Sequence, residues 1–186
     1  MAVSRKLALA SLLLLAFTEL SQAKQSFCSD DPRYPEPQDK GMVFYLQRSG
    51  NGNTVVYTAS QLADGAIDPD HPVDIFWRWY NRGGDKRPLS FMERQLAFGV
   101  KLTPLKDQPG KYTARLNAYP KLPVLVEPTA DGKVRAIMTI DGEPAQLVCI
   151  YVGWRQQLGI IPEVLYVDFF GRTLDGGKKV VKRRRP

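Results

Sequence analysis

Apolar and polar residues alternate with a period of two along most of the chain from Met42 onward. This spacing puts successive side chains on opposite faces of a sheet, so it predicts β-strands. Turn-forming stretches rich in Gly, Asn, Asp and Pro separate the alternating segments. The predicted strands are 42–48, 54–60, 73–80, 100–105, 111–119, 122–128, 134–140, 145–153 and 163–171.

One stretch, "PLSFMERQLAFG" (88–99), has helical spacing instead. Ser90 and Glu93 stand in capping-box spacing, Met92 and Leu96 share a face, and Gly99 can end the helix. About eight short strands and one short helix predict a mainly β domain, an antiparallel β-barrel or β-sandwich. The sequence does not decide between barrel and sandwich. The prolines of 122–128 place that strand at a sheet edge.

The stretch "DIFWRWYNRGG" (74–84) carries the heaviest aromatic content of any predicted strand. One of its faces is purely apolar and is predicted to belong to the core: Val73, Ile75, Trp77 and Trp79. The alternate face is mixed and includes Phe76, Arg78 and Tyr80. An arginine between aromatic rings can stack on them and still offer hydrogen-bond donors. We therefore predict that Phe76, Arg78 and Tyr80 bind a ligand, with a structural cation–π arrangement as the alternative.

The N-terminus has the features of an export signal. Arg5 and Lys6 precede the apolar run "LALASLLLLAF" (7–17), and "SQA" (21–23) supplies small residues before a cleavage point after Ala23. We predict a signal peptide at 1–23, and therefore a periplasmic or extracellular protein. No later run is long and apolar enough for a membrane helix, so no transmembrane segment is expected in the mature chain.

The rest of the chain divides into three predicted parts. Residues 24–41 form an irregular leader, 42–177 a single β domain, and 178–186 a basic tail. The net charge is +7, and the tail "KKVVKRRRP" contributes six basic residues to it. We expect this tail to be flexible and to contact anionic surfaces or only to aid solubility. Export argues against a nucleic-acid partner.

The sequence has two cysteines, Cys28 and Cys149. In an oxidising compartment the pair can form one disulfide, which would tie the leader to a late strand. The alternative is two unrelated thiols, with Cys149 simply buried in "LVCIYV". Spacing alone does not distinguish the two.

Sequence motifs for catalysis are lacking. The chain has a single histidine, His71, and contains no zinc motif, nucleophile elbow, phosphate loop or dinucleotide fingerprint. Catalytic residues therefore stay unknown, and no metal or cofactor is predicted. Two weaker possibilities remain open. One is general acid–base work by Asp168, Glu127 or Glu163. The other is calcium bound in the loop 64–74 by Asp64, Asp68, Asp70, His71 and Asp74, although the spacing matches no EF-hand and polar turns explain these residues better.

Four segments resemble an uncharacterised domain family of exported, mainly bacterial proteins. They are "NTVVY" (53–57), "PVDIFWRW" (72–79), "LSFMERQLAFGV" (89–100) and "VLYVDFFGR" (164–172). The resemblance covers most of the chain from Asn53 onward. It implies a single secreted domain of unknown function and transfers no mechanism.

The preferred hypothesis is a non-enzymatic β-domain of the cell envelope that binds a small molecule or an envelope component. One alternative is a carboxylate-dependent hydrolase of an envelope polymer, using residues such as Asp168. The other is a structural interaction module that uses its basic tail. Whether Phe76, Arg78 and Tyr80 line a pocket depends on whether the sheet closes into a barrel.

Overall fold

The computed structural model describes residues 26–31, 33–156, 162–175 and 177–186; the predicted signal peptide lies outside them. The described chain is mainly β, as predicted, and every predicted strand is present. Two strands and one short helix were not predicted: β4, β11 and the 3-10 helix η1 (Tyr80–Arg82). The strands are β1 (Met42–Arg48), β2 (Asn51–Ala59), β3 (Val73–Trp79), β4 (Asp85–Pro88), β5 (Val100–Pro104), β6 (Tyr112–Leu116), β7 (Val124–Pro128), β8 (Val134–Ile140), β9 (Glu143–Arg155), β10 (Glu163–Thr173) and β11 (Lys179–Arg184).

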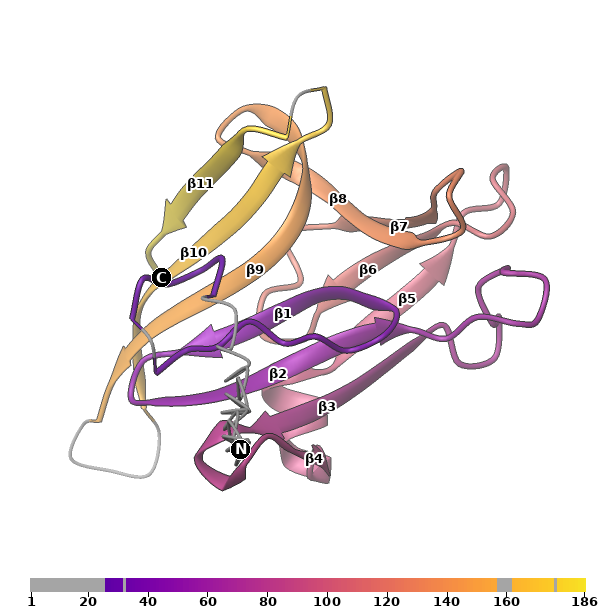
Figure 1. Ribbon diagram of the computed structural model, residues 1–186. Helices are drawn as coiled ribbons and strands as arrows, with labels where there is room; N and C mark the ends of the chain where they lie inside the picture. Colours follow the sequence, from indigo (N-terminus) through magenta and orange to yellow (C-terminus); the bar gives the residue numbers. More distant parts are fainter. Residues whose placement is uncertain (1–25, 32, 157–161, 176) are drawn as a thin grey trace, which may run out of the picture.

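All eleven described strands belong to one curled sheet, in the order β4-β3-β2-β1-β9-β8-β7-β6-β5, with β10 and β11 attached to β9 (Figure 1). The long strand β9 explains the curl. The first part of β9 pairs with β8 and a later part pairs with β1, while β10 pairs along the other edge. Strands β1 and β8 therefore leave the same edge of β9 and lead into two arms, β1–β4 and β8–β5.

This sheet corrects the predicted antiparallel barrel or sandwich. The β1–β9 pair is parallel, so the sheet has mixed orientation. It curls into a half-barrel that the strands do not close. The predicted edge strand is also wrong, because β7 lies between β6 and β8. Its prolines fall at the end of the strand and just before it, where no ladder bond is lost.

The two arms face each other and bury the main core between them. The first arm contributes Leu46, Val55 and Trp77, and the second contributes residues such as Leu116 and Met138. Trp77 is 3% exposed, and Trp79 packs at the core's edge. The prediction that the tryptophan face of β3 is core is confirmed.

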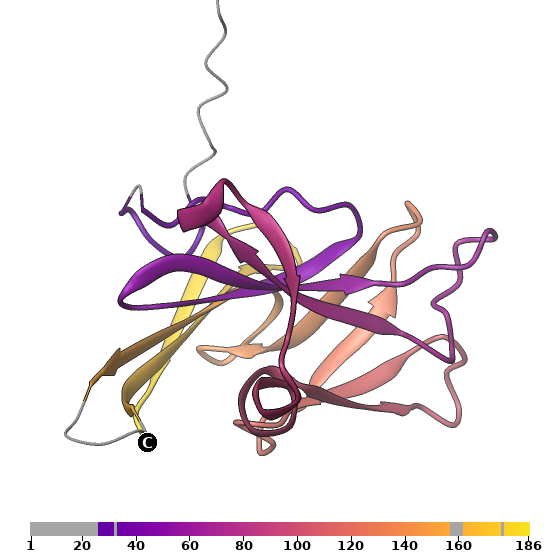
Figure 2. The same cartoon turned by 90° about the horizontal axis from the view of Figure 1, so that it is seen from below.

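The helix η2 (Glu93–Phe98) spans the open side of the half-barrel and is wound as a π-helix (Figure 2). The predicted capping box is present: the Ser90 amide donates to Glu93 Oε2 at 2.8 Å, and the Glu93 amide donates to Ser90 Oγ at 3.3 Å. Both arms hold the helix. Tyr57 of β2 donates its hydroxyl to the Phe98 carbonyl at 2.8 Å, and Asn117, just after β6, donates to the Arg94 carbonyl at 2.9 Å.

Gly99 ends η2 for a different reason than predicted. Its φ is −64°, so it does not use the left-handed conformation of a typical glycine stop. A Cβ at this position would lie 1.9 Å from the Arg94 carbonyl oxygen. The glycine is therefore needed for close packing of the helix end. The apolar side chains that share the predicted helix face, Met92 and Leu96, are 60% and 65% exposed.

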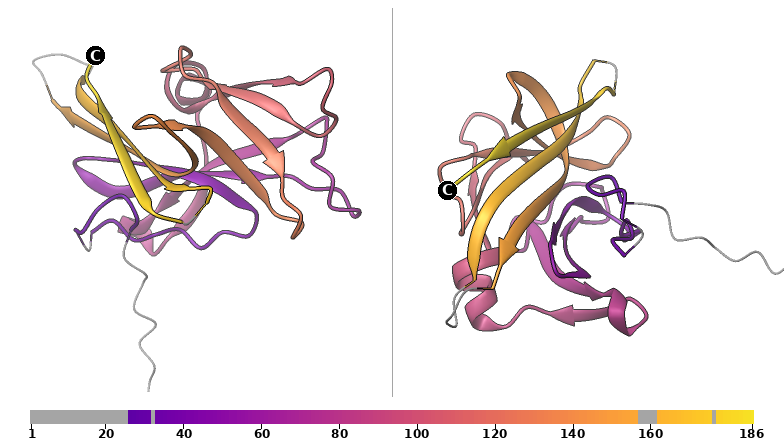
Figure 3. Two further views of the ribbon diagram at one scale, coloured as in Figure 1. Left: turned by 90° about the horizontal axis from the view of Figure 1, so that it is seen from above. Right: turned by 90° about the vertical axis from the view of Figure 1, so that its left-hand side faces the viewer.

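The N-terminal leader lies across the outer face of β1 and β9 (Figure 3). Cys28 and Cys149 form the predicted disulfide, with their Cα atoms 5.8 Å apart. Next to it Ser26 donates to Gln47 Oε1 at 2.6 Å, and the Phe27 amide donates to the Tyr45 hydroxyl at 2.9 Å. These contacts bury β1 on both faces.

The basic C-terminal stretch is not the flexible tail that the sequence predicted. Residues Lys179–Arg184 form β11, which pairs antiparallel with β10 and makes an outer edge of the sheet. On the outer face Arg183 lies opposite Asp168 and donates two hydrogen bonds of 2.7 Å to its carboxylate. Positive charge on an edge strand also discourages edge-to-edge association. Among the described residues, no helix has the length and apolar character required to cross a membrane.

Candidate functional site

The curled sheet encloses an apolar pocket of about 310 Å³ on its concave side. Strands β1, β9 and β10 supply one wall, and η2 with the segment after β6 supplies the other. The apolar lining residues are Leu46, Ala97, Leu116, Ala118, Tyr119, Ile150, Val152, Val164, Val167 and Phe169. The chain end at Arg184, Arg185 and Pro186 completes the lining. A cavity of this size and chemistry is typical of a site for a small apolar molecule.

The strand registers explain why these walls are apolar. Leu46 pairs with Ile150 in the parallel ladder, and Ile150 pairs with Phe169 across β9 and β10. Alternate residues share a face, so Val152 and its partner Val167 continue the same surface. The neighbouring residues Tyr151 and Asp168 point to the outer face instead.

Beyond the pocket lining, the next residues on the same face of β1 and β9 carry hydrogen-bond donors. Two residues after Leu46 comes Arg48, and two residues after Val152 comes Trp154. The Arg48 guanidinium lies between two indoles, 5.2 Å from the ring centre of Trp77 and 6.0 Å from that of Trp154. Arg48 Nε and Trp154 Nε1 are fully buried, and neither has a hydrogen-bond partner among the described residues. Two buried donors thus lie next to the apolar lining in the sheet, because Arg48 pairs with Val152 and Trp154 pairs with Val164.

Neighbouring contacts fix the position of this donor pair. Ser49 Oγ accepts from the Trp154 amide at 2.9 Å and donates to the Trp154 carbonyl at 3.0 Å. Trp77 donates its indole N–H to Glu93 at 3.2 Å. Burial lowers the pKa of Arg48, and the nearby charge of Glu93 opposes this shift only in part. The guanidinium is therefore desolvated without a bonded counter-charge.

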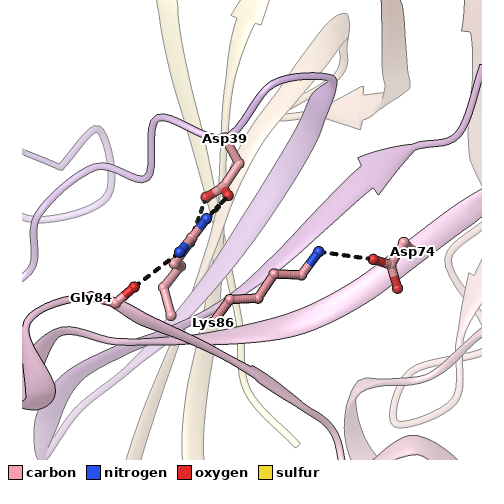
Figure 4. Close-up of polar contacts among 5 residues, drawn as sticks. Asp39, Asp74, Gly84 and Lys86 are labelled. Atoms are coloured by element: carbon pink, nitrogen blue, oxygen red, sulfur yellow. Dashed lines mark hydrogen bonds and ion pairs between the residues drawn. The ribbon is translucent and has the colours of Figure 1, made fainter.

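The predicted ligand residues lie elsewhere, on the outer side of the first arm. Arg78 and Tyr80 line a hollow of about 280 Å³ together with the leader. The Arg78 guanidinium already has partners. Arg78 Nε donates to both carboxylate oxygens of Asp39 at 3.1 Å, and Arg78 Nη1 donates to the Gly84 carbonyl at 3.0 Å (Figure 4). The Asp39 hydrogen bonds raise the pKa of Arg78. The pair holds the leader against β3.

The other two predicted residues differ in exposure. Phe76 is 3% exposed, lies beneath Lys86 Nζ at 3.8 Å from its ring centre, and does not line the hollow. Tyr80 belongs to the short helix η1, and burial raises its pKa to about 12. The structure thus brings Arg78 and Tyr80 together but leaves Phe76 out. A ligand-binding role for the three stays a prediction, and the carboxylate already on Arg78 argues for a structural role.

The three carboxylates of the hydrolase alternative all form ion pairs with basic side chains. Asp168 is bound by Arg183, and Glu163 by Arg155 at 2.6 Å. Glu127 forms ion pairs with Lys111 at 2.9 Å and with Arg135 at 2.7 Å. Although burial alone would raise the pKa of Glu127, the hydrogen bonds from these two bases outweigh it and lower the pKa. Each of the three carboxylates is therefore paired with at least one basic side chain.

The aspartates of the 64–74 loop act in turns. Asp64 accepts from the Ala66 amide at 2.9 Å, Asp68 accepts from the Asp70 amide at 2.9 Å, and Asp74 pairs with Lys86 at 3.3 Å. The contacts of Asp64 and Asp68 are Asx-type contacts that shape the backbone, while that of Asp74 is a salt bridge between two strands. Within the described residues, no group of three or more His, Cys, Asp or Glu side chains is placed to hold a metal ion.

Comparison with known proteins identifies the family. The family model for a domain of unknown function, DUF4833, matches residues 44–183. The chain belongs to the DUF4833 family. The matched region includes both arms of the sheet and most of β11, so the basic strand is part of the DUF4833 domain.

Two further comparisons add little. The chain is 28% identical over 116 residues to a ribonuclease D of Acidiphilium cryptum (strain JF-5). The match covers 62% of this chain and spans 30% of that protein's length. No solved structure matches the chain.

Proposed function

We propose that this chain is a non-enzymatic, exported binding protein that takes the apolar part of a small molecule into the pocket between β9–β10 and η2. The pocket carries this proposal. Its volume of about 310 Å³ suits a small ligand, and its lining is apolar apart from the two arginines at the chain end. Most of the lining comes from strands, which give a rigid, preformed surface.

Export is part of the proposal. It is supported by the signal-like N-terminal sequence and by the Cys28–Cys149 disulfide, since such bonds persist in oxidising compartments. The ligand would then be a small molecule or envelope component met outside the cytoplasm. The name of the Acidiphilium relative carries no activity to this chain, because the match spans 30% of that protein.

An uncharged fluorescent probe, N-phenyl-1-naphthylamine, tests the proposal. We expect its emission to rise and shift to the blue with wild-type protein, because the probe leaves water for an apolar site. Ala97→Trp puts a large side chain on the pocket wall and should abolish the signal. Ala130→Trp, in the exposed β7–β8 turn, is the matched control and should bind like wild type. Equal binding by the folded Ala97→Trp variant would refute the pocket as the site.

A further inference from the structure

Two buried hydrogen-bond donors without a partner among the described residues lie next to residues of the apolar pocket in the sheet. Pocket residue Val164 pairs directly with Trp154 in the β9–β10 ladder. Leu46 and Val152, two more pocket residues, are each followed two positions later by Arg48 and Trp154. Arg48 and Trp154 do not themselves line the pocket, but each is the ladder partner of a residue that does: Arg48 pairs with Val152, and Trp154 with Val164. Their Nε and Nε1 atoms are buried.

Buried donors without partners are costly in a stable fold. An unmade hydrogen bond forfeits the interaction with water and receives nothing in return. The cost is larger for a guanidinium, whose charge prefers water or a counter-ion. The indole faces of Trp77 and Trp154 compensate only part of this. A buried donor of this kind is expected to receive its acceptor from a bound water, ion or ligand.

We propose that Arg48 and Trp154 bind the anionic oxygen head of the molecule whose apolar part fills the pocket. The inference rests on the proposed function and narrows its ligand to amphiphiles with a carboxylate, sulfate or similar head. A guanidinium suits such a head because it offers several donors in one plane together with a full positive charge. The indole N–H adds one further donor, and it cannot accept a hydrogen bond.

Two other arginines line the pocket, but they suit the head less well. The side chains of Arg184 and Arg185 are exposed on and just beyond β11, where water and salt screen their charge. Arg48 is the more strongly desolvated group, so an anion beside it gains more. Arg184 and Arg185 are placed instead to attract an anionic molecule from solution toward the pocket.

The test compares ligands that differ only in the head: decanoate, decyl sulfate and decanol, titrated into the full chain by calorimetry. We expect the two anions to bind about tenfold or more tightly than decanol, since charge-assisted hydrogen bonds contribute at least that factor. Arg48→Met should remove this preference while leaving decanol binding unchanged. Trp154→Phe keeps a ring and deletes the N–H, so it should lower the anion preference about threefold. Arg87→Met, an exposed arginine on β4, is the charge-matched control.

The outcomes separate the two proposals. Binding of none of the three ligands would overturn the apolar pocket and the head site together. Equal binding of decanol and the anions, unaffected by Arg48→Met, would leave the pocket standing and overturn the head site. A preference that survives Arg48→Met but disappears in Arg184→Met and Arg185→Met would place the head at the other end and also overturn it. Trp154→Phe keeps the test decisive if Arg48→Met fails to fold.

Discussion

Two arginines in the first arm of the sheet both contact aromatic rings, but their polar surroundings differ. Arg78 on β3 and Arg48 on β1 both lie over aromatic rings, Phe76 at 5.5 Å and Trp77 at 5.2 Å. Arg78 faces outward, where the leader brings Asp39 to it. Arg48 faces inward beside the apolar pocket, and no described carboxylate bonds it. The same aromatic–arginine arrangement therefore carries a structural ion pair at Arg78, whereas at Arg48 it leaves a buried donor without a partner among the described residues.

The difference arises from the leader, which covers the outer face of the first arm and reaches none of the pocket lining. The disulfide fixes the leader near β9, and Asp39 completes its path at β3. The outer arginine is thus a structural contact that secures a segment. The inner arginine lies between two indoles, and its buried Nε has no hydrogen-bond partner among the described residues; under the proposal above, a ligand supplies that partner.

The largest effect should come from removing the disulfide that holds the leader. Replacing Cys28 by Ser opens a loop with a sequence separation of 121 residues and should lower the free energy of unfolding by about 4 kcal/mol. Urea denaturation followed by tryptophan fluorescence measures it. The loosened leader should weaken the Arg78 contact, while probe binding in the pocket persists wherever the variant is folded. Loss of pocket binding in the folded variant would show that the two regions are not separate.

Arg78→Met should have the next largest effect. It leaves Asp39, whose side chain is 10% exposed, without its partner, and we expect a loss of about 2 kcal/mol. Arg48→Met removes a charge that has no such partner and should change stability by less than about 1 kcal/mol. Urea midpoints of the two variants compare them directly. Similar losses would contradict the distinction between a structural and an available arginine.

Asp39→Asn supplies the control for Arg78→Met. If the stability loss of Arg78→Met comes from the broken ion pair, the double variant Arg78→Met/Asp39→Asn should be no less stable than Arg78→Met alone. The double variant no longer holds an uncompensated carboxylate. Additive losses would mean that each side chain contributes through other contacts.

Features set by neighbouring residues were predictable from the sequence, whereas features set by distant contacts were not. Period-two alternation located the strands because burial on one face leaves a local imprint, and the capping box marked η2 through neighbouring residues. The parallel β1–β9 pair, the covering leader and the partner of Arg78 depend on contacts between distant segments. Strand β11 was not predicted, because the charged sequence "KVVKRR" is typical of a solvent-exposed tail and forms a strand here by pairing with β10.

The pocket end was missed although a signal was present. Arg48 continues the alternate face that begins with Phe44 and Leu46, so a charge falls on a face that is otherwise apolar. Trp154 extends the inward face of β9 in the same way. Arg48 and Trp154 each lie in a strand with fewer aromatic residues than the segment 74–84. That aromatic segment led instead to the prediction of Arg78, which pairs with Asp39 of the leader.

A smaller effect should appear as an acid-dependent loss at Glu127, a paired carboxylate of the second arm. Lys111 and Arg135 hold its pKa below the ordinary value of 4.5 in the folded protein. A depressed carboxyl pKa stabilises the fold above the unfolded value, and this contribution is lost as pH falls through the folded one. Glu127→Gln should cost about 1 kcal/mol at neutral pH, discounted for the partly exposed bases, and less below pH 4.5. Urea midpoints across pH should show a shallower acid slope in the variant, and Asp107→Asn, an exposed residue, should keep the wild-type slope.

The smallest effect on stability, about 1 kcal/mol or less, is expected for Ser49→Ala. Ser49 is a positioning residue, since its hydroxyl bonds both the amide and the carbonyl of Trp154. Loss of these contacts loosens the backbone that carries the Trp154 indole, whose ring lies beside the Arg48 guanidinium. We expect the preference for decanoate over decanol to fall about twofold while decanol binding stays constant, and Ser49→Thr, which keeps a hydroxyl, to restore the preference. If calorimetry instead shows both ligands weakened equally, Ser49 supports the pocket wall as a whole and does not position the donor.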